Sequence, residues 1–184
     1  MLNILIFLCF VGGAFAQSSN NGPCVEIPCE NIDNEKLVGR WRDVLRSKTV
    51  SDEEMKCLEV NFTLTAPGKF KIIYSARSKE DNEYYSVWGK GQIGGNFFNT
   101  TNHLPVFGLY PVGAYVVESD YNSYLVLYGC KCEASTCTSY GWFKVRKLND
   151  TLDFNYYNEI FQNALRKKNI PHLEMEAVDT TDCP

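Results

Sequence analysis

Cysteine is the residue type in this chain with the most evident chemistry, because a thiol can bind a metal or form a disulfide. The chain has eight cysteines, and three of them form a compact cluster, Cys130-x-Cys132-x4-Cys137. Zinc sites often contain a CxxC pair, which this cluster lacks, whereas disulfides form in secreted proteins. The apolar start of the chain predicts secretion, so we expect disulfides in this cluster and no metal.

Residues suited to catalysis are few. The chain has two histidines, His103 and His172, and no Ser/His/Asp set in a usable context. The pair Glu53-Glu54 is typical of a solvated loop, and the cysteines lie near expected strand ends rather than within strands. A single histidine such as His103 is weak support for haem binding. We therefore expect a protein that is not an enzyme.

Residues 1–16 predict a secretory signal peptide. They carry no charge, contain an apolar run over 4–11, and end in Ala14-Phe15-Ala16, a small-x-small cleavage site. The run is too short to span a bilayer, and no later stretch is long and apolar enough for a transmembrane helix. Cleavage removes Cys9 and leaves residues 17–184 as one extracellular domain. Its seven cysteines allow up to three disulfides with one thiol left over.

Composition excludes some partners. The formal net charge is -4, which argues against nucleic acid and against an anionic membrane surface. Aromatic residues make up 14% of the chain, which favours strands and large apolar contacts. Three Asn-x-Thr sequons predict glycosylation at Asn61, Asn99 and Asn149.

The middle of the chain consists of short strand-like runs separated by turn residues. Eight runs fit this pattern, at about 40–47, 58–64, 70–76, 83–93, 96–99, 113–118, 123–128 and 139–146. Residues 104–110 read as a proline-interrupted continuation of the fifth run. After Asn149 the apolar residues recur at helical spacing between 152 and 165, and Pro171 ends the helix.

Eight antiparallel strands joined by short loops remove their exposed edges by closing into a barrel. We therefore predict an all-β fold: an eight-stranded antiparallel up-and-down β-barrel with one C-terminal α-helix packed outside. A barrel of this size holds side chains or one small ligand. The candidate ligand-binding residues are mostly aromatic and occur on most strands: Tyr74, Tyr85, Trp88, Phe97, Phe107, Tyr115, Leu125 and Trp142.

Three motifs stand in a characteristic order. Gly39-Arg40-Trp41 opens the first strand, Ser119-Asp120-Tyr121-Asn122-Ser123-Tyr124 forms a late loop, and Arg146 ends the last strand. In this combination the chain resembles the lipocalins over about 24–183, and among them the arthropod bilin-binding and apolipoprotein D-like branch. The resemblance implies that Trp41 closes the barrel floor and that Arg146 packs over it by a cation–π contact.

The resemblance also implies two disulfides. Carried over to this chain, one joins Cys24 to Cys130 (or to Cys132), and the other joins Cys57 to Cys183. Cys29 and the remaining cluster cysteines depart from the family pattern. Pairing of Cys29 with a cluster cysteine and pairing of Cys132 with Cys137 across a hairpin both stay open, and a leftover thiol is free, intermolecular or ligand-attached.

The expected function is that of a secreted carrier with a small hydrophobic ligand inside the barrel. No cofactor is certain, but a bilin-type pigment is one candidate ligand, because bilin-binding relatives place an aromatic against the pigment where Trp142 stands. A lipid or a retinoid suits the same walls. The alternative is a secreted interaction or defence lipocalin that sequesters an amine mediator or binds a protein partner. A homo-oligomer is also compatible with the sequence.

Overall fold

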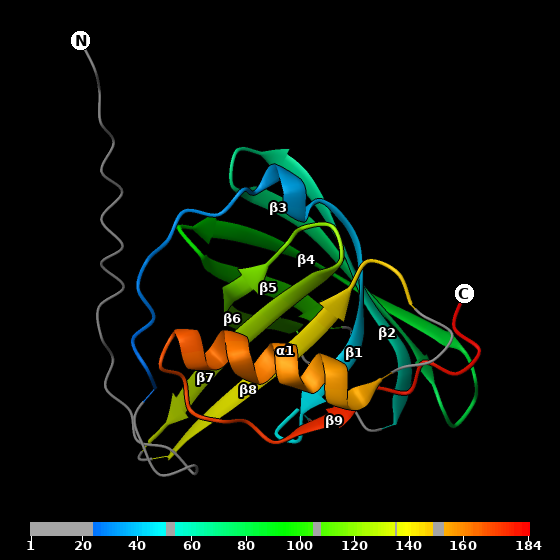
Figure 1. Cartoon of the computed structure of the whole chain (residues 1–184). Helices are drawn as coiled ribbons and strands as arrows, with labels where there is room; N and C mark the ends of the chain where they lie inside the picture. Colours follow the sequence, from blue (N-terminus) through cyan, green and yellow to red (C-terminus); the bar gives the residue numbers. More distant parts are fainter. Residues whose placement is uncertain (1–23, 51–53, 105–107, 135, 149–152) are drawn as a thin grey trace.

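Nine strands and one α-helix follow one another in the computed structural model, which describes residues 24–50, 54–104, 108–134, 136–148 and 153–184 (Figure 1). Residues 1–16, Phe107 and Asn149, which carry three of the sequence predictions, lie outside the described residues. After a short 3-10 helix η1 (Glu35–Leu37), the elements are β1 (Gly39–Ser47), β2 (Met55–Ala66), β3 (Lys69–Ser78), β4 (Tyr84–Gly94), β5 (Phe97–Leu104), β6 (Gly108–Ser119), β7 (Tyr124–Glu133), β8 (Thr136–Val145), α1 (Phe154–Lys167) and β9 (Met175–Ala177).

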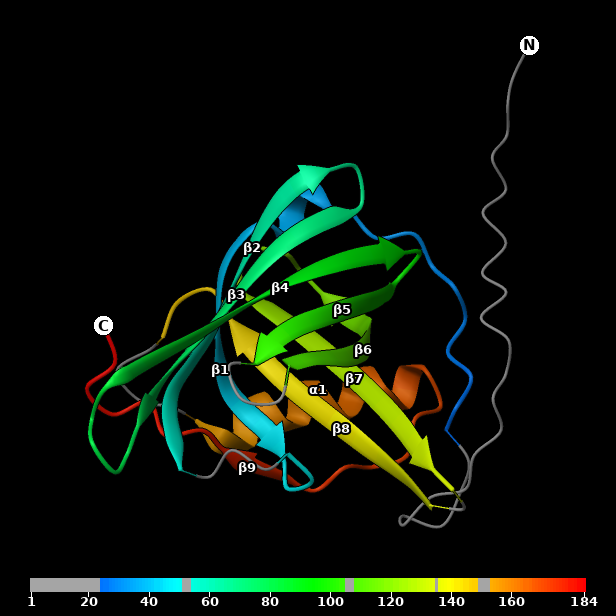
Figure 2. The ribbon, with the colours of Figure 1, turned by 180° about the vertical axis from the view of Figure 1, so that it is seen from behind.

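The strands β1 to β8 form a closed antiparallel barrel. Each of β2 to β8 pairs with the next strand, and β1 closes the sheet by pairing with both β8 and β2 (Figure 2). The short strand β9 then adds to β1 beyond the point where β2 leaves it. The eight-stranded barrel with one external helix is confirmed, and β9 is an element that the sequence predicted only as an extended tail.

Several strands extend beyond their predicted bounds, among them β2, β5, β6 and β7. Residues 108–110 belong to β6, which pairs with β5 from Leu104↔Gly108 to Phe97↔Tyr115. We expected residues 104–110 to continue the fifth run, and we began the next strand only at Gly113, whereas Pro111 lies within β6 opposite Thr101. The proline obscured the start of β6 because proline lacks the N–H that a ladder normally uses.

Two separate apolar clusters hold the barrel together. The first lies outside, where Phe161 and Leu165 of α1 pack on Phe143 and Val126 of the sheet. The second fills one half of the interior and contains Trp41, with the other members Leu37, Val60, Phe62, Phe70, Ile72, Ile93, Phe98, Ala114, Val116, Leu125 and Leu127. Strand alternation explains the division, since neighbouring residues face opposite sides of the sheet.

The end of the barrel next to η1 is closed around Trp41. This side chain has no exposed surface, and its Nε1 donates to the Leu37 carbonyl at 2.9 Å. The guanidinium of Arg146 lies 3.7 Å from the centre of the Trp41 ring and donates to the carbonyls of Lys36 and Val38. Gly39 has a φ of +101° here, and a Cβ on it would lie 3.0 Å from the Arg146 Nη1 atom. Glycine is required for both reasons.

The 119–124 loop supports this closed end. The carboxylate of Asp120 accepts hydrogen bonds from the backbone N–H groups of Asn122, Ser123 and Tyr124 at 3.1, 2.7 and 2.9 Å. Tyr121 has a φ of +63°, and its carbonyl accepts from the Nε of Arg146. The loop therefore helps to hold Arg146 over Trp41.

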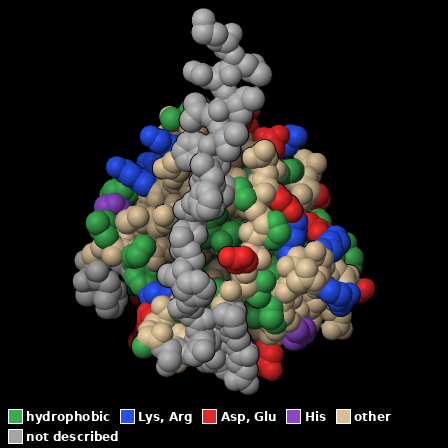
Figure 3. Space-filling view, turned by 90° about the vertical axis from the view of Figure 1, so that its left-hand side faces the viewer, with side chains coloured by type: hydrophobic (Ala, Val, Ile, Leu, Met, Phe, Trp, Pro, Cys, Tyr) green, Lys and Arg blue, Asp and Glu red, His purple; other side chains and the backbone are tan. Residues whose placement is uncertain are grey.

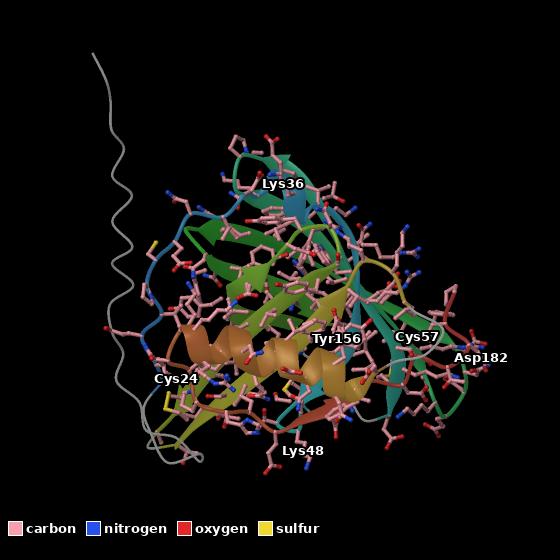
Figure 4. The ribbon with its side chains drawn as sticks, viewed as in Figure 1. Cys24, Lys36, Lys48, Cys57, Tyr156 and Asp182 are labelled. Carbon is pink, nitrogen blue, oxygen red and sulfur yellow. A yellow bond between two sulfur atoms is a disulfide. The ribbon has the colours of Figure 1, made fainter. Side chains whose placement is uncertain are left out.

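Three disulfides join pairs of described residues, and two of them fix the ends of the described chain. Cys24 pairs with Cys130 and Cys57 with Cys183, the two bridges that the family resemblance implies (Figure 4). They span 106 and 126 residues of sequence, and in the chain-entropy model a long loop gives the larger constraint on the unfolded state. Cys132 pairs with Cys137. Because Cys130 pairs with Cys24, all three cluster cysteines have disulfide partners other than Cys29. Among the described residues there is no free cysteine thiol.

The buried Trp41 gives the first prediction. Replacing it with alanine should lower the free energy of unfolding by about 3–5 kcal/mol, because a large cavity is left in the interior cluster and the Arg146 guanidinium loses its stacking partner. Trp88→Ala, at a tryptophan that is 45% exposed, is the matched control and should cost far less. Urea denaturation followed by circular dichroism measures both, and equal losses would contradict the role given to Trp41.

The Asp120 carboxylate gives a pH-dependent prediction. Its partial burial favours protonation, but the three backbone donors outweigh this and lower the pKa of Asp120. A lowered carboxyl pKa stabilises the fold above the ordinary Asp value of about 3.9, and this contribution is lost as the pH falls through the lower folded-state value. Asp120→Asn should therefore be less stable than the wild type at pH 7, and the difference should shrink below about pH 4. Denaturant titrations across pH test this, and a constant difference would refute it.

Candidate functional site

The candidate site is the interior of the barrel on the side of Trp41 away from η1. The interior cluster around Trp41 forms an apolar floor. The strands continue past this floor toward the loops that join β1 to β2, β3 to β4, β5 to β6 and β7 to β8, which we call the open end. Side chains alternate between the two faces of a strand, so residues an even number of positions from a floor residue on the same regular strand also face the interior.

A layer of paired charges lies directly above the floor. Lys144 and Asp43 form an ion pair, and their residues are only 6% and 4% exposed. Burial raises the pKa of Asp43, although the nearby positive charges of Lys144 and Arg46 oppose this. Arg46 is also buried, and its Nε donates to the Glu176 carboxylate on β9 at 2.7 Å. The layer thus contains two cations and two anions, each with a partner.

Neutral polar groups complete this layer. Burial raises the pKa of Tyr74 to about 12, although the side chains of Thr100 and Asn102 beside its hydroxyl act in the opposite direction. Asn102 is 8% exposed, and its Oδ1 has no hydrogen-bond partner among the described residues. A Cβ on Gly89 would lie 2.4 Å from this oxygen, so a glycine on β4 leaves the space that Asn102 fills.

Aromatic rings line the interior toward the open end. Trp142 and Tyr140 on β8 stack with ring centres 6.2 Å apart. Tyr85 and Tyr110 occupy interior-facing positions on β4 and β6 and are 52% and 46% exposed. Because inward-facing rings remain exposed there, this end of the interior is open to solvent. The arrangement offers apolar surface and hydrogen-bonding groups.

The structure brings four of the predicted ligand-binding residues to the interior. Tyr74 lies in the polar layer, Trp142 above it and Tyr85 at the open end. Leu125 is 1% exposed within the floor cluster, so it supports the site from below. Whether these residues contact a ligand stays a prediction.

Three other predicted wall residues face outward and so do not line the interior. Trp88 pairs with Ile73 and His103 on the outer face, and its ring stacks on that of His103. Phe97 and Tyr115 pair across β5 and β6 on the outer face, with ring centres 4.7 Å apart. Their strands place the alternate residues inward, such as Gly89 and Phe98. Aromatic character indicated strands correctly but did not give the side of the sheet.

The polar layer was missed by sequence reasoning. Asp43 stands two residues after Trp41, and Lys144 stands two residues after Trp142. Alternation from these tryptophans would have placed both charges inside the barrel. Arg46 had no such signal, because β1 shifts its register against β8 between Asp43 and Leu45 and so changes the face that later residues occupy.

A hollow of about 1080 Å³ lies on the opposite, outer side of β3, β4 and β5. We call it the outer-face hollow. Its outward-facing lining residues are Thr65, Lys69, Lys71, Ile73, Ser86, Trp88, Lys90, Gln92, Asn99 and Thr101. Two predicted glycosylation sites lie exposed on this side of the sheet, Asn99 within the hollow and Asn61 opposite Ile73. Their glycosylation stays a prediction.

The sulfur atoms of Cys24, Cys132 and Cys137 lie within 4.8 Å of one another, but each belongs to a disulfide and so is not a thiolate ligand. Among the described residues, no helix has the length and apolar character needed to cross a membrane.

The ion pair inside the barrel gives a third prediction. Lys144→Met leaves the Asp43 carboxylate buried without its partner, which should lower the free energy of unfolding by about 3–5 kcal/mol. The double variant Asp43→Leu/Lys144→Met removes both charges and should regain most of this loss, since an apolar pair of similar volume is often neutral or stabilising. Chemical denaturation of the three proteins measures the effect. A double variant as unstable as the single one would show that the charges are not coupled.

Comparison by sequence finds no relatives. No protein-family model matches the chain, and no curated protein sequence matches it significantly.

Solved structures share its architecture. Lobster apocrustacyanin A1 matches with a TM-score of 0.67 and 14% identity, covering 95% of this chain and 96% of that protein. Insecticyanin from the tobacco hornworm Manduca sexta matches with a TM-score of 0.70 and 16% identity, covering 91% and 89%. A biogenic amine-binding protein matches with a TM-score of 0.60 and 14% identity, covering 82% and 83%. These proteins are lipocalins, and the chain accordingly has the lipocalin fold that its motifs predict.

Proposed function

We propose that this protein is a secreted carrier that holds a small, uncharged hydrophobic molecule in the open half of its barrel. The observation that carries the proposal is the row of inward-facing aromatic side chains above the apolar floor, which includes Trp142, Tyr140 and Tyr110. Burial of apolar ligand surface against such rings is the usual source of affinity in carrier sites, and a few polar groups set the orientation.

The paired charges above the floor support an uncharged ligand. Asp43 is neutralised by Lys144 and Arg46 by Glu176, so neither charge is available for a ligand of opposite sign. A charged group moved into this layer would lose its water and gain no partner, which is costly. Tyr74 and Asn102 remain as neutral groups that are able to orient a hydroxyl, a carbonyl or an N–H.

The same observation disfavours the amine-sequestering alternative. One solved structure with this fold is named a biogenic amine-binding protein. An ammonium group needs a carboxylate without a competing cation, and in the described interior the Asp43 carboxylate already has Lys144. A carrier of apolar molecules is therefore the better reading of this site.

Within this class a tetrapyrrole pigment, a lipid or a retinoid remains compatible with the walls. A bilin combines a large flat apolar surface with polar N–H groups, and so suits both the aromatic rings and the neutral polar groups. Secretion, with removal of residues 1–16, is part of the proposal and agrees with three disulfides among the described cysteines.

Trp142 allows a direct test. Bromine quenches tryptophan fluorescence only near contact, so 11-bromo-1-undecanol reports a ring that touches the bound probe. Titration of the wild type should quench its fluorescence to saturation. Trp142→Phe should lose most of this quenching, whereas Trp88→Phe, which removes the outer-face tryptophan, should retain it.

Two outcomes would count against the proposal. Quenching that disappears in Trp88→Phe and persists in Trp142→Phe would move the binding site to the outer face. Absence of saturable binding, together with no small molecule in native mass spectra of protein purified from its natural source, would reject the carrier function itself.

A further inference from the structure

The outer-face hollow has a strongly one-sided charge. Lys71 on β3 stands directly opposite Lys90 on β4, and Lys69 lies two residues away on the same face. All three are exposed, and none forms an ion pair with a carboxylate of the described residues. Like charges directly opposite each other in a sheet are destabilising. This arrangement is unusual for a chain whose net charge is -4, and a bound anion would relieve the repulsion.

An exposed aromatic surface lies beside these lysines. The Trp88 ring stacks on His103 with ring centres 3.6 Å apart and planes 15° from parallel, and Trp88 remains 45% exposed. Lys90 lies two residues further along the same strand and faces the same way. Figure 3 shows basic side chains grouped beside hydrophobic side chains and a histidine on this flank of the molecule. The hollow thus offers cations and an aromatic face together.

We propose that the outer-face hollow binds an acidic, sulfated polysaccharide chain. The Cα atoms of Lys71 and Lys90 are about 5 Å apart as opposed residues of neighbouring strands, and those of Lys69 and Lys71 about 7 Å apart along one strand. From these positions the long lysine side chains can reach closely spaced sulfates on successive sugars. The flat apolar face of a sugar ring packs against an exposed indole, which places the chain across Trp88.

The geometry disfavours other anionic partners. An acidic peptide that binds by strand addition needs an unpaired sheet edge, whereas β3, β4 and β5 are each paired on both sides. A bilayer is flat and would meet the rim of the hollow rather than the Trp88 ring within it. The net charge of -4 on the whole protein weakens attraction to any polyanion, so the binding proposed here has to come from the lysines and the Trp88 ring of the hollow itself.

Asn99 must be controlled in the experiment, because it lines the hollow and belongs to a sequon. A glycan there would occupy part of the proposed binding surface. The full secreted protein is therefore compared before and after treatment with an N-glycosidase, and the treated form is used for all variants.

The test is calorimetric titration with a heparin octasaccharide at low and high salt. Binding should be saturable at low salt and weaken as salt screens the lysines. Lys71→Gln/Lys90→Gln should raise the dissociation constant about tenfold, the effect of two surface ionic contacts. Trp88→Ala should also weaken binding. Lys36→Gln/Lys48→Gln, which removes the same formal charge at two lysines that do not line the hollow (both labelled in Figure 4), should change it less than about twofold.

Each contrary result has a definite meaning. Equal weakening in both lysine pairs would show diffuse attraction, and no binding by the treated wild type would reject the site. Polyglutamate bound as tightly, with no effect of Trp88→Ala, would replace the sugar with an acidic protein segment. Preference for an oligonucleotide or for phosphatidylserine vesicles would likewise overturn the proposal. The outcome is independent of the interior site, because 11-bromo-1-undecanol binding should be unchanged in Lys71→Gln/Lys90→Gln.

Discussion

The closure of the sheet through β1 is the constraint on which the rest of the molecule depends. The first half of β1 pairs with β2, and its second half pairs with β8 and with β9. A strand that serves both edges must bend, and β1 does so at the irregularity between Asp43 and Leu45. Trp41 and Asp43 face the interior by alternation, and the bend returns Arg46 to the same side, so that Trp41 lies in the floor and the two charged residues lie in the layer above it.

Those levels define what the interior is able to do. Trp41, with the Arg146 guanidinium stacked on its ring, closes one end of the barrel. Its indole N–H donates to the Leu37 carbonyl, so the buried ring has its hydrogen-bond partner. The ion pairs of Asp43 and Arg46 form the next level, where each charge is matched locally. Only beyond them do aromatic rings meet solvent. Under the proposed function, a ligand would therefore meet aromatic walls and an electrically balanced polar layer, which is the reason for proposing an uncharged molecule rather than an amine.

The two faces of the sheet carry different kinds of chemistry because of alternation along β3, β4 and β5. Phe70, Ile72 and Phe98 point inward and form part of the floor. The intervening Lys71 on β3, and Trp88 and Lys90 on β4, point outward. The helix α1 covers the outer side near β1, β7 and β8, and it leaves the outer side of β3 to β5 uncovered (Figure 1). The uncovered face is where the basic and aromatic side chains are found.

The sequence by itself determined the class of fold. Alternation, turn residues and the helical spacing after Asn149 predict the barrel and its helix, and Gly39, Trp41, Asp120 and Arg146 predict the closed end, because these are local patterns or short motifs. Tertiary structure decided which side of the sheet each aromatic occupies. Trp142 faces inward and Trp88 outward, since the phase of a strand depends on bulges and partners that single strands do not reveal. The buried pair of Asp43 and Lys144 also required the structure, because 101 residues separate the two charges in the chain.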